Sequence, residues 1–506
     1  MNTPTLRCAS LAVLAALGGL LPGVPGCASA RHGAAKPGPA ATAGKPVITL
    51  DGQFNDWPEH VGAIADADWV YFHATVEGAV APLQAAPETL ALWLDADADV
   101  KTGATMPIPA AAGNGVDLVV EFSPQDPQHP GQTKSGVAAF ALGAQGAAIP
   151  LGSGQIGLAA APTFASTAYE IRISRHIDSA AAPALAGALQ SRGRARVLFV
   201  LKDGSGKIVG WSDPETFSKP AASPVAPKTD RGIPAKPAGS IRIVSYNVLK
   251  SKLASEPNTF ARLFQVLDAD VILAQEWNAD AATATAWFTA IVTGAHAWNA
   301  RAAAGDVVIV SPFPIDPLGP DALTLDSGSG GGEKEPAVRF VAGLVKTPAG
   351  LIAVGTAHLK CCGTAGSVED KTRIAQAAAI NRAMKAALDS AKPALRVFAG
   401  DFNLVGTRAP LETLRAGLDT DGSDLAVADP QRFGDAAYYT WADARTEFPP
   451  GRLDFALYSD ASAQVVQSFV VDTSLFSTKA LARMGLDAGD TGASDHLPVV
   501  VDLKPR

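Results

Sequence analysis

The sequence has little of several features that mark large classes of protein. Its 506 residues include four cysteines, too few for a disulfide framework. No continuous apolar stretch reaches the roughly 18 residues of a membrane span, which argues against a multi-span membrane protein. Basic residues are outnumbered, with 41 Lys and Arg against 49 Asp and Glu and a formal net charge of −8. This balance does not fit a protein that coats nucleic acid, because clustered Lys and Arg hold phosphate backbones.

The composition that remains is that of a folded protein with more than one domain. Hydrophobic residues make up 47% of the chain and charged residues 18%, so a packed core is expected and wholesale disorder is excluded. At roughly 100 to 200 residues per domain, the length predicts two to four domains.

The first residues are typical of a secretory signal. Arg7 precedes an apolar run over 11–21, and small residues follow. Two cleavage interpretations remain open. The VPGC segment ending at Cys27 resembles a bacterial lipoprotein signal, with 1–27 as the signal region and Cys27 as the lipid anchor, whereas cleavage after Ala30 would leave a soluble exported protein. We expect export to the periplasm or cell surface, with anchoring to a membrane, followed by a flexible tether over 28–45.

A proline-rich segment divides the rest of the chain. Residues 219–240 carry five prolines and little aliphatic content, which predicts an interdomain linker. The region before it, 46–218, shows short strands between turn signals and predicts an all-β sandwich. The region after it, 241–506, mixes strands with helices. The strands expected before the linker are 47–50, 69–74, 90–94, 117–122, 169–173 and 195–200.

Two motifs in 46–218 resemble the family 9 carbohydrate-binding-module-like sandwiches. One is Leu50-Asp51-Gly52 followed by Asp56-Trp57, and the other is Asp95-Ala96-Asp97-Ala98-Asp99 followed by Thr102-Gly103. The resemblance implies glycan binding, although no aromatic platform is defined, and a protein ligand or none remains open. The alternating carboxylates suit a hard cation such as Ca²⁺, or they form a plain acidic loop at a strand end.

The second region is expected to contain strands, helices and one long capped helix. Ser367 and Asp370 form a capping box, so a helix should begin at Ser367 and run to about 389. A shorter helix is expected near 257–268. The expected strands are 241–246, 270–274, 337–346, 351–357, 395–399, and those near 453–458, 466–471 and 497–502.

Unusual polar residues stand at the ends of these apolar strands. Ionisable groups within apolar strands are costly unless they are paired or bind a metal, so several such placements in one region point to a shared site. The segments are Ser245-Tyr246-Asn247, Gln275-Glu276, Ala357-His358-Leu359, Gly400-Asp401-Phe402-Asn403, Arg452-Leu453-Asp454-Phe455 and Ser494-Asp495-His496.

In their order, these residues resemble the endonuclease/exonuclease/phosphatase superfamily. The resemblance spans nearly all of 241–506 and implies a DNase I-like α+β fold, a four-layer α/β/β/α sandwich. It also implies hydrolysis of a phosphodiester or phosphomonoester by metal-assisted attack of water. Mg²⁺ is the expected cofactor, with Mn²⁺ or Ca²⁺ as alternatives. For the metal it implies Glu276 as primary ligand with Asn247 beside it, and Asp495 at the same or a second position.

The resemblance also implies catalytic roles. His496 acts as base or phosphate binder, and Asp454 orients its imidazole. Asp401 orients or deprotonates the attacking water, and Asn403 donates to a phosphoryl oxygen. His358 either hydrogen-bonds the phosphate or protonates the leaving group.

The substrate stays open among nucleic acid, a phospholipid, as for a sphingomyelinase, and a small phosphoester. Leu249 departs from the acidic residue typical of the abasic-site nucleases and disfavours that branch. A cell-surface binding protein without catalysis is the alternative from another class.

Three features near the expected site also have more than one interpretation each. Cys361 and Cys362 form a vicinal disulfide, remain a pair of thiols, or bond to another chain. The glycine-rich stretch 326–332 forms a flap or a plain surface hairpin. Trp441 lines the cleft or belongs to the core.

Overall fold

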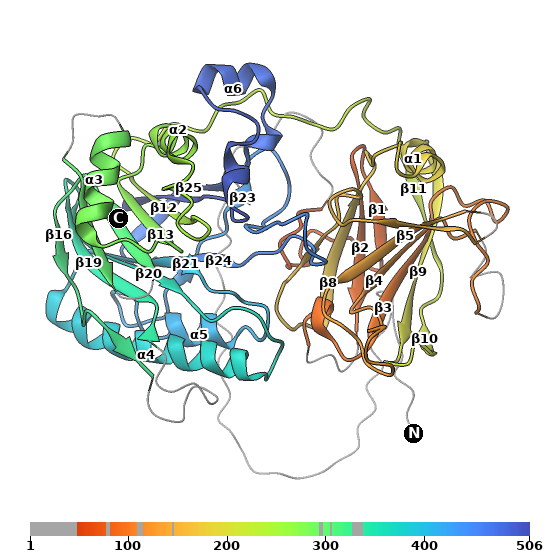
Figure 1. Ribbon diagram of the computed structural model, residues 1–506, viewed down its shortest axis with the longest axis horizontal. Helices are drawn as coiled ribbons and strands as arrows, with labels where there is room; N and C mark the ends of the chain where they lie inside the picture. The colour runs from red at the N-terminus through yellow and green to blue at the C-terminus, as the bar shows by residue number, and fades with distance from the viewer. Residues whose placement is uncertain are drawn as a thin grey trace, which may run out of the picture.

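The computed structural model describes residues 48–76, 81–108, 115–143, 146–292, 297–303, 306–325 and 337–506. The expected signal with Cys27, the tether and the glycine-rich stretch 326–332 lie outside the described residues. Two folded regions lie side by side, a β-sandwich and a larger mixed domain (Figure 1). Among the described residues, no helix combines enough length and apolar character to cross a membrane.

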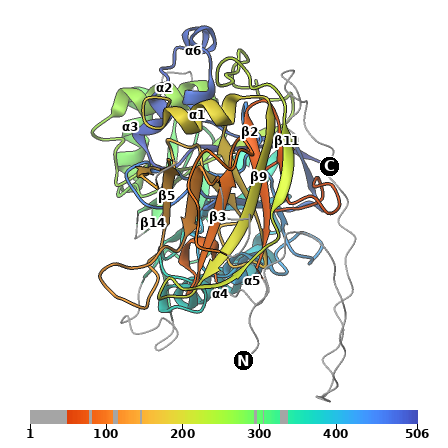
Figure 2. The ribbon, with the colours of Figure 1, turned by 90° about the vertical axis from the view of Figure 1, so that its right-hand side faces the viewer.

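The first region is rich in strands that form two sheets. The smaller sheet has the order β1-β2-β8-β7, and the larger has the order β10-β9-β3-β4-β5-β6, with β11 also paired to β9. Figure 2 shows this domain facing the viewer, with β3 beside β9. The strands are β1 Ala63–Ala65, β2 Trp69–Thr75, β3 Thr89–Asp95, β4 Leu118–Phe122, β5 Val137–Leu142, β6 Ala148–Leu151, β7 Ala159–Ala161, β8 Ala168–Ser174, β9 Gly193–Lys202, β10 Ile208–Trp211 and β11 Glu215–Lys219, and the helix is α1 Pro183–Gln190.

Strand β3 illustrates how alternation builds this region. Leu92 and Leu94 belong to the apolar core between the two sheets, whereas Ala91 and Trp93 belong to a second apolar cluster on the opposite face. Because successive side chains of a strand point to opposite faces, the continuous apolar run of β3 is buried on both sides.

Of the strand expected at 47–50, the described residues 48–50 form no strand of a sheet. Leu50 forms only an isolated bridge, and its partner is Ala437 in the second region. The Leu50 backbone N–H donates to Ala436 O at 2.8 Å, and Tyr438 N–H donates to Leu50 O at 3.1 Å. The segment therefore pairs across the domain boundary and not within the sandwich.

Residues 220–240, all of them described, contain no helix and no strand of a sheet. Strand β11 continues through Lys219, one position into the proline-rich segment. The segment touches both regions: Arg175 Nη2 donates to Pro220 O at 2.9 Å, and Thr229 forms a bridge with Phe476.

The second region is a four-layer sandwich with the DNase I-like fold. Its two large sheets have the orders β14-β15-β13-β12-β26-β25-β23 and β16-β19-β20-β21-β24-β22, and β17 pairs with β18 in a separate two-stranded sheet. Helices α2 and α3 cover the first sheet, and α4 and α5 cover the second (Figure 1). An aliphatic core that includes Ile243, Val271, Val354 and Val397 fills the space between the sheets.

The elements of the second region are β12 Ile241–Asn247, α2 Pro257–Leu267, β13 Val271–Gln275, α3 Ala281–Ile291, β14 Asn299–Ala303, β15 Val307–Ser311, β16 Ile315–Pro317, β17 Leu323–Thr324, β18 Ala337–Val338, β19 Phe340–Thr347, β20 Gly350–His358, α4 Val368–Ala391, β21 Leu395–Asp401, α5 Ala409–Arg415, β22 Ala426–Val427, β23 Gln431–Arg432, β24 Asp454–Tyr458, β25 Ala463–Val470, α6 Thr478–Met484 and β26 Val499–Pro505. Short 3₁₀ turns occur at Leu83–Ala85, Thr473–Leu475 and Asp490–Ala493.

Helix α4 confirms the capping prediction. The Ser367 side chain accepts a hydrogen bond from Asp370 N, which satisfies one of the free N–H groups at the helix start. The helix ends at Ala391, where Lys392 adopts a left-handed conformation before Pro393. The sequence therefore defines both ends of this helix to within a few residues.

Candidate active site

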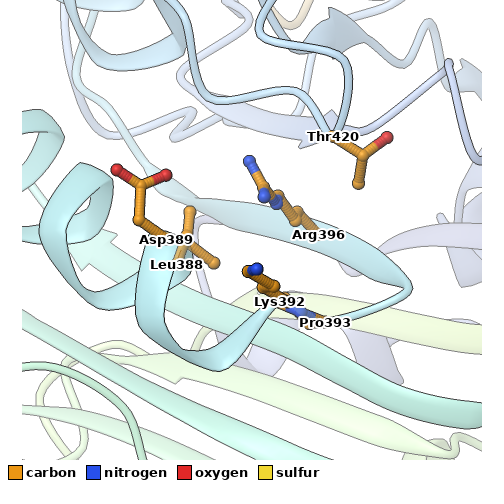
Figure 3. Close-up of a pocket in the computed structure, with 6 residues that line it drawn as sticks. All are labelled: Leu388, Asp389, Lys392, Pro393, Arg396 and Thr420. Atoms are coloured by element: carbon orange, nitrogen blue, oxygen red, sulfur yellow. The ribbon is translucent and has the colours of Figure 1, made fainter.

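A pocket of about 330 Å³ has none of the predicted site residues in its lining, and its six lining residues are shown in Figure 3. Its lining includes Asp389, Lys392 and Arg396. Arg396 is near the start of β21, whereas Asp401 ends that strand, and about 16 Å of extended chain separates them. The candidate site lies at the other end of the strand.

Strand register brings the predicted residues together. In the first sheet, β12 and β13 run parallel with Asn247 opposite Gln275, so Glu276 follows directly beside Asn247. In the second sheet, β20 and β21 run parallel with His358 opposite Asp401. Strand β24 then pairs Asp454 with Asp401. Strand ends from both sheets thus deliver these side chains to one edge of the sandwich.

Asn247 connects two carboxylates from different sheets. Its Nδ2 donates to Glu276 Oε1 at 3.2 Å and to Asp401 Oδ2 at 3.1 Å. Its Oδ1 accepts from Leu249 N at 3.0 Å, which fixes the amide orientation. Glu276 has a left-handed backbone with φ of 57°, and its Oε2 accepts from Lys250 N at 2.9 Å. Non-glycine residues with left-handed backbone angles are uncommon, and they cluster at functional sites.

The glycine before Asp401 is required by the packing of the two parallel strands. A Cβ at Gly400 would lie 2.0 Å from Ala357 O, far inside van der Waals contact, and its φ is 151°. The close approach of β20 and β21 sets Asp401 beside His358. The Gly-Asp-Phe-Asn motif therefore has a steric requirement at its first position and a polar one at its second.

His496 and Asp454 form a buried pair that Thr440 completes. His496 Nδ1 lies 2.8 Å from Asp454 Oδ2, and the Thr440 hydroxyl donates to the same oxygen at 2.6 Å. His496 Nε2 lies 3.6 Å from Asp401 Oδ2. Burial alone would lower the pKa of His496, but the carboxylates of Asp454 and Asp401 outweigh it and raise the pKa to about 10. His496 is consequently an imidazolium at neutral pH.

Asp401 lies at the centre of the group. Its Oδ2 is 3.6 Å from His358 Nε2 as well as from His496 Nε2. Burial raises the pKa of Asp401, while the two histidines act in the opposite direction. Its other oxygen accepts from Asn403 N at 3.0 Å, and Asn403 Nδ2 donates to Leu359 O at 3.2 Å.

Asp495 stands beside this group and is held by an indole. Trp441 Nε1 donates to Asp495 Oδ2 at 3.0 Å, and Trp441 also bridges to His496 through the backbone. The partly buried Trp441 thus contacts the site rather than packing in the apolar core. Among the described residues, no direct hydrogen bond joins Asp495 to Glu276, Asn247 or Asp401.

The described donor set fits a hard divalent cation. Oxygens of Asp401 and Asp454 and a nitrogen of His496 all lie within 4.8 Å of one another. Asp454 Oδ1 and Asp495 Oδ1 are buried, and neither has a hydrogen-bond partner among the described residues. A buried oxygen without a donor is costly unless an ion or water satisfies it. Carboxylate oxygens are the ligands that Mg²⁺ and Ca²⁺ prefer.

Three residues of the site were not predicted in their observed roles. Thr440 supports Asp454, Trp441 holds Asp495, and Arg339 donates to His358 Nδ1 at 2.8 Å. The Tyr-Thr-Trp segment at 439–441 gives no strand pattern, and Arg339 is indistinguishable in the sequence from a surface charge. Only the pairing of β19 with β20 reveals the position of Arg339.

The acidic cluster of the β-sandwich contains Asp117 in place of Asp99 of the predicted motif. Asp95 and Asp97 meet Asp117, the residue just before β4, with carboxylate oxygens within 4.8 Å of one another, whereas the exposed Asp99 accepts from Lys101 N. Asp95 Oδ2 accepts a hydrogen bond from Arg196 at 3.0 Å.

The Cys361 and Cys362 side chains are free thiols, with their sulfur atoms 2.8 Å apart.

One family model matches the part of the chain that contains the candidate site. The profile of the Endonuclease/Exonuclease/phosphatase family matches residues 244–496, half of the chain. A search of curated proteins finds no match.

Three solved structures are each similar to about half of the chain. The human Nocturnin catalytic domain with bound sulfate is 15% identical, covers 54% of this chain and 97% of its own, and has a TM-score of 0.37. Sphingomyelinase C from Streptomyces griseocarneus is 17% identical, with coverages of 52% and 99% and a TM-score of 0.31. The Neisseria 3′ phosphatase NExo bound to a product DNA hairpin is 17% identical, with coverages of 52% and 98% and a TM-score of 0.35.

Proposed function

The chain belongs to the endonuclease/exonuclease/phosphatase family, and we propose that it is an exported, divalent-metal-dependent hydrolase of phosphate esters. The observation that carries this proposal is the single polar network in which Asn247 links Glu276 to Asp401, and Asp401 faces both His358 and His496. A structural role alone does not account for two histidines and several carboxylates gathered at strand ends.

The carboxylates of Glu276, Asp495, Asp401 and Asp454 are the side chains available to hold the metal, because His496 is cationic, and Mg²⁺ is the ion we propose. Bound there, the ion would act as a Lewis acid toward a phosphoryl oxygen and favour formation of a nucleophilic hydroxide from water. Asn247 keeps the Glu276 and Asp401 carboxylates close in spite of their mutual repulsion, because its amide donates to both.

The remaining residues stabilise charge and direct water. His496, kept cationic by Asp454 and Asp401, balances the negative charge that develops on the phosphoryl group. Asp401 accepts a hydrogen bond from the attacking water and orients it. Asn403 is held by hydrogen bonds from its backbone to Asp401 and from its side chain to Leu359, and the role we propose for it is donation to a phosphoryl oxygen.

The proposed substrate class is defined by the phosphate ester group, which nucleic acids, phospholipids and small phosphoesters share. We propose a phosphodiester or phosphomonoester in a nucleic acid, a phospholipid or a small molecule, encountered outside the cytoplasm. Lipid attachment at Cys27 and glycan binding by the β-sandwich belong to the same proposal, and they rest on the sequence motifs alone.

The test is a hydrolysis panel with matched variants. The purified chain is assayed on bis-p-nitrophenyl phosphate, p-nitrophenyl phosphate, DNA, RNA, sphingomyelin and inositol phosphates, with Mg²⁺, Mn²⁺ or Ca²⁺. Chelator, Glu276→Ala and His496→Ala should each lower turnover at least about 100-fold. Asp389→Asn in the remote pocket is the control and should retain full activity. Unchanged turnover in the two alanine variants would refute the proposal.

A further inference from the structure

The guanidinium of Arg339 makes a direct hydrogen bond to the ring of His358. Arg339 Nη1 lies 2.8 Å from His358 Nδ1, and Nη2 donates to Leu359 O at 3.0 Å. Arg339 precedes β19 and His358 ends β20, and the hairpin register joins their backbones, with His358 N donating to Arg339 O at 3.0 Å. Both ends of this contact are therefore held by the sheet.

This contact determines which ring nitrogen of His358 carries hydrogen. A guanidinium has five N–H donors, no acceptor, and remains protonated in proteins. At 2.8 Å, Nδ1 must accept from Arg339, since a hydrogen on Nδ1 would point at another N–H. The ring is then the neutral tautomer with its hydrogen on Nε2.

Asp306 is the competing partner for Nδ1. Its Oδ1 lies 3.5 Å from His358 Nδ1, and its Oδ2 lies 3.5 Å from Arg339 Nη1. Both distances are longer than a good N–H···O hydrogen bond, whereas the arginine contact is of normal length. The distances therefore favour Arg339 as the group that sets the state of the ring.

The Nε2–H side of His358 faces the network of the active site. Nε2 lies 3.6 Å from Asp401 Oδ2 and 3.9 Å from Glu276 Oε1. A neutral imidazole can donate a hydrogen bond from this position, but it is a very poor source of a transferable proton. His496 differs, because a carboxylate and not a guanidinium lies against its Nδ1.

We propose that Arg339 is a positioning residue that holds His358 in its Nε2–H tautomer, so that His358 donates a hydrogen bond to a phosphoryl oxygen of the substrate and does not protonate the leaving group. The assignment rests on the proposed phosphoesterase function, and it chooses between the two roles that the sequence left open for His358.

The state of the ring is measured without turnover. The full chain is labelled with ¹⁵N-histidine, and long-range ¹H–¹⁵N spectra of its eight histidines are recorded, with His358 assigned from the signal lost in His358→Gln. The expected pattern is a protonated Nε2 and an unprotonated, hydrogen-bonded Nδ1. A ring protonated at Nδ1 in the native protein overturns the proposal, whether or not any variant folds.

Three variants separate Arg339 from Asp306. Arg339→Met should convert His358 to a mixture of states, whereas Arg339→Lys, which retains a cationic donor, should keep the native pattern. Asp306→Asn should leave the tautomer unchanged. If Asp306→Asn alters the pattern and Arg339→Met does not, Asp306 is the controlling residue and the proposal is wrong. Thermal unfolding of each variant checks that the fold is retained.

Leaving-group dependence tests the role of His358 itself. A p-nitrophenolate leaves without a proton, while an alkoxide or phenolate of higher pKa needs one. If His358 binds a phosphoryl oxygen, His358→Gln lowers kcat/KM by the same factor, about 100-fold, for p-nitrophenyl and phenyl esters of phosphate. Arg339→Met should lower it about 10- to 100-fold, again equally for both esters. A loss confined to the phenyl ester contradicts the proposal.

The two proposals can fail separately. If no phosphate ester is hydrolysed, or if Glu276→Ala is fully active, the phosphoesterase function is wrong while the spectra still report the tautomer. If hydrolysis is present but Nδ1 carries the hydrogen, only the role of Arg339 is wrong.

Discussion

Arg172 in the β-sandwich and Asp435 in the second domain form a two-pronged buried ion pair. Arg172 Nη1 lies 2.7 Å from Asp435 Oδ1 and Nη2 lies 2.6 Å from Oδ2. The two side chains are 1% and 4% exposed, and Arg432 contacts Asp435 from its own domain. The Arg172 guanidinium also stacks on Trp69 at 3.8 Å from the ring centre. Such geometry joins the domains in one defined orientation.

Removing Arg172 should loosen this junction. In Arg172→Met, Asp435 keeps Arg432 but loses one of two buried cations, so we expect about 3 kcal/mol of destabilisation in urea unfolding. Arg445→Met is the control, because Arg445 pairs with Asp443 on the surface with its side chain 78% exposed, and it should change the unfolding midpoint little. Equal effects of the two variants would contradict this role.

The same pair predicts a loss of stability in acid. Burial would raise the pKa of Asp435, but Arg172 and Arg432 outweigh it and lower the pKa to about 2. An acid with a depressed folded-state pKa stabilises the fold above its unfolded value near 4 and loses that contribution as the pH falls toward 2. We expect about 2 kcal/mol to be lost over this range, measured as urea midpoints at a series of pH values. Asp435→Asn should lack this part of the acid transition, and an unaltered pH profile would contradict the assignment.

Thr440 should matter to turnover through Asp454. Its hydroxyl donates to Asp454 Oδ2 and accepts from Leu453 N and Asp454 N. Thr440→Val has a similar shape without the donor, and losing a hydrogen bond to a carboxylate predicts a fall in kcat of about 10- to 100-fold. Thr440→Ser keeps the donor and should restore most of the activity. A fully active valine variant would show that Asp454 needs no such support.

We expect that replacing Gly400 even by alanine will disrupt the fold. The added Cβ would meet Ala357 O at 2.0 Å, and the backbone of a parallel pair has no room to separate. We expect Gly400→Ala to lose about 4 kcal/mol or more of stability, or to fail to fold, as judged by circular dichroism and thermal unfolding. Gly492→Ala provides the control near the site, because nothing lies within 4 Å of its added Cβ. A native-like alanine variant at 400 would mean that the strand spacing is not as tight as the structure shows.

Local patterns in the sequence determined the secondary structure around the site. The apolar run before Asp401 gives β21, and the cap at Ser367 gives the start of α4. The polar residues at strand ends could be named as candidates from the sequence, since motifs such as Gly-Asp-Phe-Asn are contiguous in the chain, and the structure brings them to one edge of the sandwich. Residues 48–50 do not form the expected strand, because Leu50 pairs with Ala437 in the other domain.

The sequence by itself therefore determined which segments are strands and helices and which polar residues stand at their ends, because periodicity, caps and turns are properties of neighbouring residues. Only the tertiary structure decided the partners: Arg339 against His358, Thr440 against Asp454, and Arg172 against Asp435 across the domain boundary. Those contacts depend on sheet order, register and domain orientation. These are set by the packing of the whole core, and no short stretch of sequence encodes them.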